Sequence, residues 1–574
     1  MTQWIYEKQG SKPQWGPAGV PVAVLNILKR RGINSGPDAE DFLAPMPRTT
    51  HDPVLLKDLE EAVTAIIAAA DRGDRICIYG DYDADGVTST ALLYSVIRKL
   101  TDNADFYVPS RFTDGYGLNS NAIDRIAEKG TGLLITVDCG STNAAEVEYA
   151  KSLGMGVIVT DHHELDENNI PKCLFVNPKR PDCDYPFRGL SGCGVAFKIA
   201  QGIQRRLTAK GDGRFSKADL NSLLDLVAIS TVADVVPLLD ENRTLVKYGL
   251  RILNERRRPG LRILLEMLDL QDKKLDADNI GFILAPHINS LGRIETADAG
   301  VKLLTGLCTE DELRSYAKMM VDCNIKRRSI QEDTKNICLE EIKKGGCGDL
   351  FTIIRAPGAH EGVAGIVAGS LKESLYRPVC IVTPTENGVL KGTGRCVPGM
   401  DLHEMLSECG DIFLRYGGHA GACGFTITEE NLPLFRERSR DAVCRRLAVS
   451  EDLLQEKIVI EKALDYEERT IQFAESLEML EPYGEANPKP LFALEGCTIK
   501  NVYRMGSESQ HVRFIASCDG GRDVPCVLFR RADEFADLLQ PGSTVDVAGE
   551  LGINAFNGSR KLQLTVKDIK RNQQ

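Results

Sequence analysis

The chain has 574 residues and a formal net charge of −12 at pH 7. This length excludes a single hydrophobic core and predicts about three or four domains. The composition is that of an ordinary soluble globular protein. The negative total argues against nucleic-acid binding, so local basic stretches must decide that question.

The first residues lack the basic and apolar regions of a signal peptide, and the apolar stretch at 62–70 is too short to span a membrane. We therefore expect a cytoplasmic protein without membrane association. The seventeen cysteines include no CxxC pair, and in a cytoplasm we expect them to stay reduced. Cys139 and Cys193 lie inside motifs, where we interpret them as small packing residues.

The N-terminal part of the chain contains a helical pattern at Val20–Arg31 and a loop rich in glycine and proline. We interpret it as an N-terminal cap. An amphipathic helix is predicted over Asp58–Ala70, with Asp58 as its N-cap residue and Glu61 three positions later. It leads into the apolar run Arg75–Tyr79, which predicts a buried strand.

Three aspartates at alternate positions follow this strand, in the sequence YGDYDADGVTS at 79–89. Asp81, Asp83 and Asp85 come just before a helical pattern at Val87–Leu100. Carboxylates this close repel one another unless cations neutralise them. An isolated DxD is usually a solvated acidic turn, so the interpretation depends on whether the pattern recurs.

Apolar runs that stop at acidic or histidine residues do recur. They are Gly132–Val137 before Asp138, Met155–Thr160 before Asp161-His162-His163, and Leu174–Val176 before Asn177. Helical patterns separate these runs, which predicts a parallel sheet with right-handed crossovers. Ligands bind beyond the carboxyl ends of such strands. Oxygen and imidazole ligands suit Mn²⁺ or Mg²⁺ better than a thiolate zinc site.

The ordered motifs resemble the DHH phosphoesterase superfamily. The matching segments are DYDADG (81–86), VDCG (137–140), TDHHE (160–164), SGCGVAFK (191–198) and AISTVADVVPL (228–238). The chain looks closest to the RecJ family of single-strand-specific 5′→3′ exonucleases, and the resemblance runs nearly its whole length. It implies an α/β fold in which DHH and DHHA1-type domains are joined by a long helix and followed by an OB-type β-barrel.

The resemblance also implies a pair of Mn²⁺ or Mg²⁺ ions, about 3.5–4 Å apart. The expected ligands are Asp83, Asp85, Asp138, His162 and Asp234, with Asp138 bridging the two ions. Asp81 either binds metal or orients the site, and His163 contacts the scissile phosphate or assists the leaving oxygen. Asp225 has no support as a ligand, and a cap or a salt bridge is its alternative role.

Two segments are candidates for binding the substrate near this site. In the loop Val108–Leu118, Arg111 can bind a phosphate bidentately and Phe112 or Tyr116 can stack on a base, although an ordinary surface loop is the alternative. The resemblance implies that this loop lines the pocket for the 5′ end, with Arg111 as a phosphate ligand. The segment Ala285–Ile294 resembles one that supplies an arginine to DNA, here Arg293. The role of His287 in that segment stays open.

Basic residues dominate Val246–Arg262, which carries six lysines and arginines against Glu255 alone. Such a run is either a solvated helix face or a track for a nucleic-acid backbone. Glu310–Lys344 predicts a long helix joining two catalytic halves. The resemblance implies a channel between the two α/β domains, which would admit one strand but not a duplex.

Two short apolar runs, Leu350–Ile354 and Val379–Val382, predict a second α/β domain. Its glycine-rich end resembles the substrate-binding signature of DHHA1-type domains, at Gly417, Gly418, His419 and Ala420. A tight turn before a buried strand is the alternative there. The segment KGTGR at 391–395 resembles the strand motif that precedes this signature, which implies that Arg395 contacts the DNA backbone.

Five alternating runs between 493 and 566 predict the OB-type barrel, which binds single strands by charge and stacking. Plausible contacts there are Tyr503, Arg504, His511 and Arg513. The expected domains are a cap at 1–45, a DHH domain at 46–245, a helical connector at 246–347, a DHHA1-type domain at 348–447, and a linker with the OB domain at 448–574.

The predicted function is metal-dependent degradation of single-stranded DNA from the 5′ end to 5′-mononucleotides, in DNA repair and recombination. One alternative is a DHH phosphodiesterase for small nucleotides such as nanoRNA or cyclic dinucleotides, which would not need the basic linker or the OB-like tail. A non-catalytic replication scaffold is another, but it would have lost the metal ligands. The resemblance also implies a helicase or a single-strand-binding protein as partner, and we expect a monomer.

Overall fold

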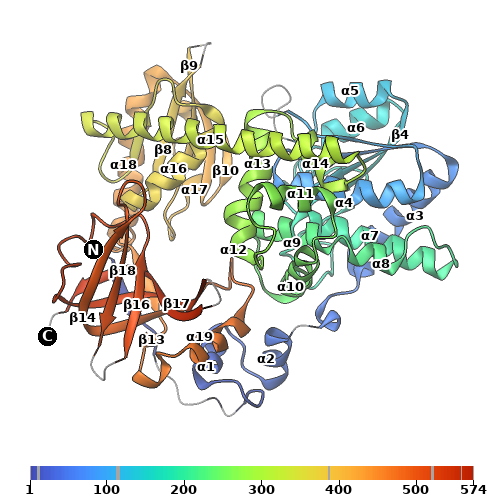
Figure 1. Ribbon diagram of the computed structural model, residues 1–574. Helices are drawn as coiled ribbons and strands as arrows, with labels where there is room; N and C mark the ends of the chain where they lie inside the picture. Colours follow the sequence, from blue (N-terminus) through green and yellow to red (C-terminus); the bar gives the residue numbers. More distant parts are fainter. Residues whose placement is uncertain are drawn as a thin grey trace. The chain divides into compact units, whose positions relative to one another are not determined.

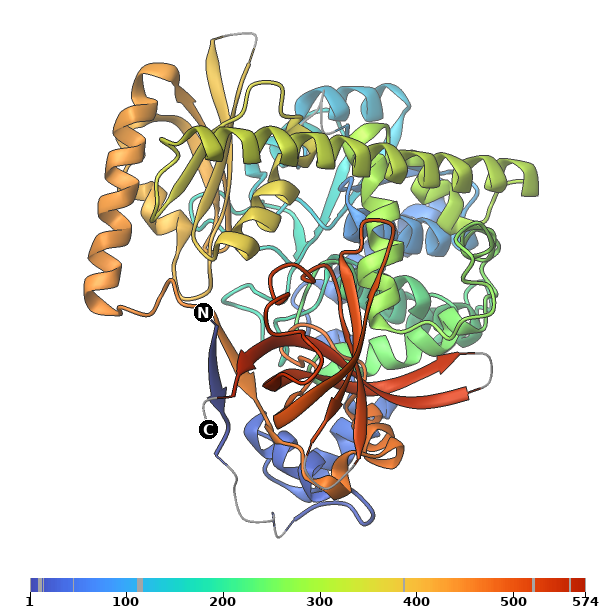
Figure 2. The same cartoon turned by 60° about the vertical axis from the view of Figure 1, so that its left-hand side comes forward.

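The computed structural model describes residues 2–572, except 9–12, 14, 45, 111–116, 386–387, 519–521 and 557–558. The chain forms two compact units (Figure 1). The larger unit comprises residues 4–292, 296–320 and 459–574, and the smaller one comprises 1–3, 293–295 and 321–458. Figure 2 shows the same elements from a second direction.

A five-stranded parallel sheet forms the centre of the DHH region, in the order β3-β2-β4-β5-β6. Its strands are β2 (Arg75–Gly80), β3 (Ala104–Tyr107), β4 (Thr131–Val137), β5 (Gly156–Thr160) and β6 (Leu174–Val176). Most strand residues are buried apolar ones, as expected where helices cover both faces. The predicted parallel α/β core is confirmed.

Helices cover the two faces of this sheet. On one face, α5 (Ser120–Glu128) and α6 (Ala144–Ser152) share a core with β2, β4 and β5. The other face is covered by α3 (Leu59–Arg72), α4 (Ala84–Leu100) and α7 (Gly192–Ala209), which pack on one another (Figure 1).

Helix α3 begins at Leu59, but Asp58 does not cap it. Asp58 has a left-handed backbone, with φ of 63°, and its side chain makes no cap hydrogen bond. Its carboxylate accepts instead from the Phe175 amide at 3.1 Å and from Arg180 at 2.6 Å. The predicted N-cap is wrong because β6 and Arg180 recruit this carboxylate from another part of the chain.

The segment after the sheet is helical. It contains α8 (Lys217–Asn221), α9 (Leu224–Ala233), α10 (Asp240–Asn254), α11 (Pro259–Met267), α12 (Ala277–Asn279), α13 (Ala285–Ile294), α14 (Asp298–Thr305) and α15 (Glu310–Lys344). The predicted long helix is confirmed as α15. His287 is buried on α13 with Nδ1 2.7 Å from the Ile283 carbonyl oxygen, which is a packing role. Among the described helices, none has the length and apolarity needed to cross a bilayer.

The smaller unit contains the second α/β domain. Its sheet has the order β10-β11-β9-β8-β7, in which only β7 and β8 pair in parallel. The strands are β7 (Thr352–Arg355), β8 (Val379–Pro384), β9 (Val389–Arg395), β10 (Phe413–His419) and β11 (Ala422–Thr428). One face packs on α16 (Glu361–Leu375) and the end of α15, and the other packs on α17 (Leu402–Ser407) and α18 (Leu432–Val449).

A closed five-stranded barrel forms the C-terminal part of the chain, as predicted. Its strands are β14 (Leu491–Met505), β15 (His511–Ser517), β16 (Asp523–Leu528), β17 (Thr544–Phe556) and β18 (Ser559–Arg571), and pairing of β14 with β17 closes it. The N-terminal helices α1 (Val22–Arg30) and α2 (Gly36–Leu43) share a core with the barrel and α19 (Ile471–Leu477). The N-terminal segment therefore packs with the barrel.

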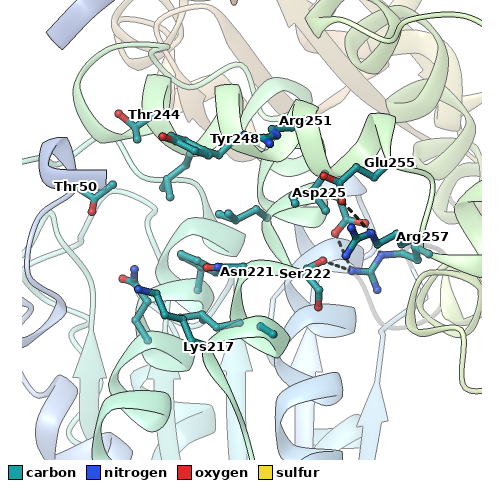
Figure 3. A pocket seen from close by; sticks show the side chains of 18 of the residues that line it. Thr50, Lys217, Asn221, Ser222, Asp225, Thr244, Tyr248, Arg251, Glu255 and Arg257 are labelled. Carbon is teal, nitrogen blue, oxygen red and sulfur yellow. Dashed lines mark hydrogen bonds and ion pairs between the residues drawn. The ribbon is translucent and has the colours of Figure 1, made fainter. Parts of the chain in front are cut away.

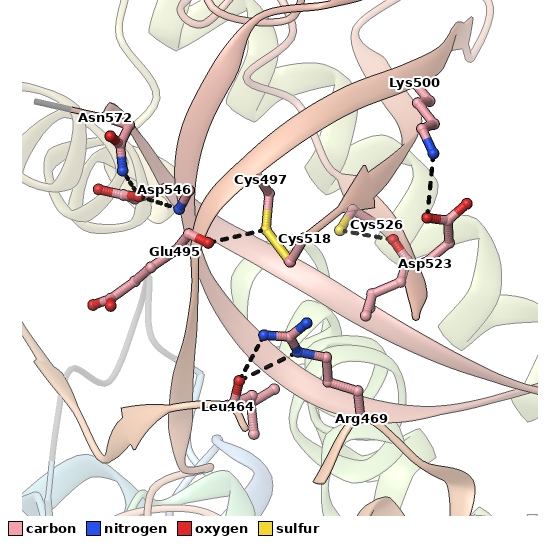
Figure 4. Close-up of a disulfide and its surroundings, with 12 residues drawn as sticks. Leu464, Arg469, Glu495, Cys497, Lys500, Cys518, Asp523, Cys526, Asp546 and Asn572 are labelled. Carbon is pink, nitrogen blue, oxygen red and sulfur yellow. Dashed lines mark hydrogen bonds and ion pairs between the residues drawn. A yellow bond between two sulfur atoms is a disulfide. The ribbon is translucent and has the colours of Figure 1, made fainter. Parts of the chain in front are cut away.

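A disulfide joins Cys497 on β14 to Cys518 after β15, with Cα atoms 4.2 Å apart (Figure 4). The neighbouring residues Thr498 and Ser517 face each other across the antiparallel strands, so the pairing brings the two sulfur atoms together. The expectation that every cysteine stays reduced is wrong for this pair, because strand register is not visible in cysteine spacing. The other fifteen cysteines are free.

Candidate metal centre

The carboxyl ends of the parallel strands lie in register. Gly80 pairs with Val137, Val137 with Thr160, and Thr160 with Val176. The residues that follow these four positions are Asp81, Asp138, Asp161 and Asn177. Strand pairing alone therefore lines up polar side chains from four separate segments along one edge of the sheet.

His162 lies at the centre of the resulting cluster. Its Nε2 atom is 3.1 Å from Oδ1 of Asp138, and 3.6 Å from Oδ2 of both Asp85 and Asp234. Possible ligand atoms form three groups, each within 4.8 Å: Asp81, Asp83 and Asp138; Asp85, His162 and Asp234; and Asp138, Asp161, His162 and His163. The structure thus brings together every residue that the sequence analysis placed at the metals.

Asp83 and its loop are held by backbone amides. The Asp83 carboxylate caps α4 by accepting from the amides of Asp85 and Gly86, each at 3.0 Å. The Ala84 amide donates to Oδ1 of Asn289 on α13 at 2.7 Å. The loop is therefore anchored on two sides before any cation binds.

Asp85 is buried against the first turn of α7. Its carboxylate accepts from the amides of Gly192 at 2.7 Å and Cys193 at 2.9 Å, and from the Ser230 hydroxyl at 2.6 Å. A helix N-terminus favours negative charge at this position. A Cβ atom on Gly192 would lie 2.6 Å from Cβ of Asp138, so the glycine is required by close approach.

Asp138 has a left-handed backbone with φ of 59°. A residue other than glycine rarely adopts this conformation, and such strain is concentrated at functional sites. The Asp138 amide donates to the Thr160 carbonyl at 3.1 Å, which ties the turn to the end of β5.

Asp161 is a site residue that the sequence analysis missed. Its buried carboxylate accepts from the amides of Ser141 at 2.9 Å and His162 at 2.7 Å, and lies 2.8 Å from Nδ1 of His163. Asn177, also missed, donates to the Ser141 hydroxyl at 2.9 Å and to the His163 carbonyl at 3.0 Å. Their positions directly after β5 and β6 are the feature of the sequence that could have identified them as site residues.

Burial and mutual repulsion shift the acidity of the carboxylates. Burial, and then the charges of Asp85 and Asp83, raise the pKa of Asp234 to about 8 and that of Asp138 well above its usual range. Burial and the charge of Asp85 also raise the pKa of Asp83. Raised carboxyl pKa values show that nearby positive charge is too small to stabilise the carboxylates, and a divalent cation would supply that charge.

The two histidines differ in charge. Burial lowers the pKa of His162, so that its imidazole is neutral and available as a ligand. Burial also opposes charge on His163, but the hydrogen bond and the charge of Asp161 outweigh it and raise the pKa of His163 to about 9. Adjacent residues therefore present a neutral acceptor and a protonated donor.

The candidate substrate-binding residues either belong to the smaller unit or fall outside the described residues. Arg111 and Tyr116 are outside them. Arg293 donates to the Gly362 carbonyl and Arg395 to the Gly394 carbonyl, each at 2.8 Å, and both arginines belong to the smaller unit. The hairpin residues are exposed at the end of β10 and in the turn after it: Gly417, Gly418, His419 and Ala420.

Most of the basic run after Asp240 has structural partners. Lys247 donates to the Leu43 carbonyl at 2.8 Å and Arg256 to the Asn254 carbonyl at 3.0 Å. Arg258 forms a bidentate ion pair with Asp225, at 2.7 Å for each bond. Asp225 therefore has the salt-bridge role that was its alternative.

Three known domains match successive parts of the chain. They are the N-terminal domain of the DHH family at 75–231, the DHHA1 domain at 349–444 and the RecJ OB domain at 460–568. The single-stranded-DNA-specific exonuclease RecJ of Bacillus subtilis is 36% identical over 548 residues, which cover 95% of this chain and 67% of that protein. The Escherichia coli RecJ is 35% identical and is matched over 96% of both chains. The chain belongs to the RecJ family.

Solved structures of RecJ agree with this assignment. The crystal structure of RecJ in complex with Mn²⁺ from Thermus thermophilus matches with a TM-score of 0.80 at 29% identity, covering 100% of this chain and 80% of that one. The same protein in complex with Mg²⁺ matches with a TM-score of 0.77. The resemblance to the RecJ family seen in the motifs is confirmed.

The donor set of this RecJ-family chain fits Mn²⁺ or Mg²⁺. The possible ligand atoms are carboxylate oxygens and imidazole nitrogens, and the cysteine nearest to them in sequence, Cys139, is not among them. The raised pKa values of Asp138 and Asp234 reflect burial and repulsion among neighbouring carboxylates, which a divalent cation would offset. His162 supplies a neutral nitrogen ligand beside them.

Proposed function

We propose that this chain is a metal-dependent exonuclease that degrades single-stranded DNA from the 5′ end, releases 5′-mononucleotides and acts in DNA repair and recombination. The convergence of carboxylates from Asp85, Asp138 and Asp234 on one imidazole, within 3.6 Å, supports this function. Membership of the RecJ family supports the choice of single-stranded DNA as substrate.

The residues that hold the metals are Asp83, Asp85, Asp138, His162 and Asp234. Divalent cations at such a site polarise the phosphate and lower the pKa of a bound water. Asp138 would be shared between two cations, because it belongs to two of the three groups of converging ligand atoms. Asp81 completes the acidic edge beside it.

His163 acts on the phosphate. Its Nδ1 lies 2.8 Å from Oδ1 of Asp161, which orients the ring, and the imidazole donates to a phosphate oxygen or to the leaving oxygen. The raised pKa keeps this imidazole protonated at neutral pH. Asp161 is a positioning residue, since it acts through His163.

For the other DNA contacts we propose the residues that the motifs predict. Arg111 and Tyr116 receive the 5′ end, while Arg293, Arg395 and the exposed hairpin at Gly417–Ala420 contact the strand. We also propose the five-part domain division predicted from the sequence, a monomeric state, a helicase or single-strand-binding protein as partner, and a cytoplasmic location where the DNA substrate lies.

The alternatives are less well supported. A phosphodiesterase for nanoRNA or cyclic dinucleotides has no use for the barrel closed by β14 and β17. A replication scaffold has no use for a buried cluster of carboxylates, whose desolvation is costly without cations.

The deciding experiment compares Asp138→Ala with wild type on a 5′-phosphorylated oligonucleotide in Mn²⁺. We expect cleavage to fall by more than about a hundredfold while DNA affinity stays within about threefold, because the change removes a metal ligand and no DNA contact. The control is Asp166→Ala, an exposed aspartate in a nearby loop, with unchanged activity expected. Retained cleavage by Asp138→Ala would refute the assignment, and a preference for dinucleotides over long strands would favour the small-substrate alternative.

A further inference from the structure

A cavity of about 800 Å³ opens in the helical part of the larger unit, and none of the proposed metal ligands lines it (Figure 3). Tyr248 and Arg251 project into it from α10, opposite Asn221 at the end of α8 and Ser222 just after it. Its volume is in the range of small-molecule binding sites.

The cavity carries excess positive charge. Four basic residues line it, and two of them are neutralised: Arg258 by Asp225 at 2.7 Å and Arg257 by Glu255 at 2.9 Å. Lys217 and Arg251 make no side-chain hydrogen bond or ion pair with any described residue. In a chain with a net charge of −12, two available cations at one cavity favour an anionic ligand.

The remaining lining suits the other parts of such a ligand. Oε1 of Gln201 is buried and has no hydrogen-bond partner among the described residues. Phe197, Leu220 and Leu224 supply an apolar wall, and the Tyr248 ring faces the cavity. These groups match a flat, partly apolar molecule that carries a donor and a negative group.

We propose that this cavity binds a nucleoside monophosphate. Arg251, beside Tyr248, holds the phosphate, and Lys217 adds positive charge from the opposite side of the cavity. The base lies against Tyr248 and the apolar wall, and Gln201 accepts from a donor on the ligand. The source of the ligand rests on the proposed function, because cleavage from the 5′ end releases mononucleotides. The basic run that includes Arg251 thus takes on a role in binding product.

Helix α9 connects the cavity to the metal centre. Leu224 and Asp225, at the start of the helix, line the cavity. Further along the helix Ser230 donates to Asp85 at 2.6 Å, and Asp234 is the residue that ends the helix. A ligand that changes the position of α9 changes the metal site, and by linkage metal binding changes the affinity for the ligand equally.

Calorimetry with dAMP tests the binding. The titration uses the full-length Asp138→Ala protein in EDTA, so that the metal centre takes no part in binding the phosphate. We expect one dAMP site, with affinity roughly tenfold lower in Lys217→Ala and Arg251→Ala and unchanged in Arg262→Ala. Arg262 is the control because it belongs to the same basic run, pairs with Glu266 and does not line the cavity. No binding, or equal affinity in all variants, would overturn the proposal.

Three further ligands test the chemical class of the ligand, and a Mn²⁺ titration tests the coupling. Adenosine and inorganic phosphate should each bind more weakly than dAMP, and tighter binding of tetraglutamate than of dAMP would overturn the nucleotide assignment.

Saturating dAMP should change the Mn²⁺ affinity of the wild type roughly fivefold or more, and it should leave the Mn²⁺ affinity of Lys217→Ala unchanged. Equal Mn²⁺ affinity with and without dAMP would overturn the coupling. The dAMP titration itself is done without metal or DNA, so loss of nuclease activity and loss of dAMP binding are separate outcomes.

Discussion

The Nε2 atom of His162 lies 3.1 Å from Oδ1 of Asp138, where β4 and β5 end side by side. Burial lowers the pKa of the imidazole and raises the pKa of the carboxyl group that share this contact. The contact therefore offers a cation a neutral nitrogen and a carboxyl group that binds its proton more tightly than usual.

His162→Ala should weaken Mn²⁺ binding by at least roughly tenfold, because it removes the nitrogen on which three carboxylates converge. Calorimetric titration of the metal-free protein measures the change. His403→Ala, at an exposed histidine of the smaller unit, is the control. Equal Mn²⁺ affinity in both variants would remove His162 from the ligand set.

Asp161→Asn should alter the pH dependence of cleavage. Loss of the carboxylate lowers the pKa of His163 from about 9 toward its ordinary value of about 6.5. If the protonated imidazole assists cleavage, the alkaline limb of the pH–rate profile moves down by about two pH units, with activity largely kept at pH 6. Asp166→Asn should keep the wild-type profile. An equal loss at every pH would indicate only a structural role for Asp161.

Metal binding should release protons. The pKa of Asp234 is about 8, so this carboxyl group largely holds its proton in the metal-free protein at pH 7, and burial raises the pKa of Asp138 well above its usual range. Mn²⁺ affinity should therefore rise as the pH rises toward 8. Calorimetry in buffers of different ionisation enthalpy should show release of at least about one proton per protein. A heat that is independent of the buffer contradicts this expectation.

The same shifts predict how stability depends on metal and pH. A carboxyl group with a raised folded pKa stabilises the protein fully below the unfolded pKa of about 3.9, and this stability is lost as the pH rises through the folded value. The metal-free protein should therefore lose stability between pH 6 and 8.5, and Mn²⁺ should raise Tm more at pH 8.5. Thermal unfolding with Mn²⁺ and with EDTA measures the difference, and equal Tm shifts at the two pH values would count against it.

Gly192→Ala should damage the centre although it leaves every ligand in place. Its Cβ would lie 2.6 Å from Cβ of Asp138, so α7 or the Asp138 turn has to move. We expect activity to fall by roughly tenfold or more, in line with changes to the groups that orient metal ligands. Gly213→Ala is the matched control, since its Cβ meets nothing within 4 Å. Equal activity of the two variants would show that the centre tolerates the shift.

The sequence by itself determined the elements and most of the acidic edge. Apolar runs bounded by glycines and charges predicted β2, β4 and β5 to within one or two residues, and α15 with the same bounds. Because side chains after parallel strands must share one edge, the strand ends were sufficient to bring Asp81, Asp138 and His162 together in the prediction. Local periodicity carries this information, since it reflects burial of each element against the core.

Only the tertiary structure decided which distant groups meet. The amides of α7 on Asp85, the Asp161–His163 pair, the Cys497–Cys518 disulfide and the partners of Asp58 all depend on register and packing between separate segments. The cavity beside Lys217 likewise exists only because α8, α9 and α10 leave a space between them. Spacing along a chain does not encode such contacts, because each one depends on how two independently formed elements come to rest against each other.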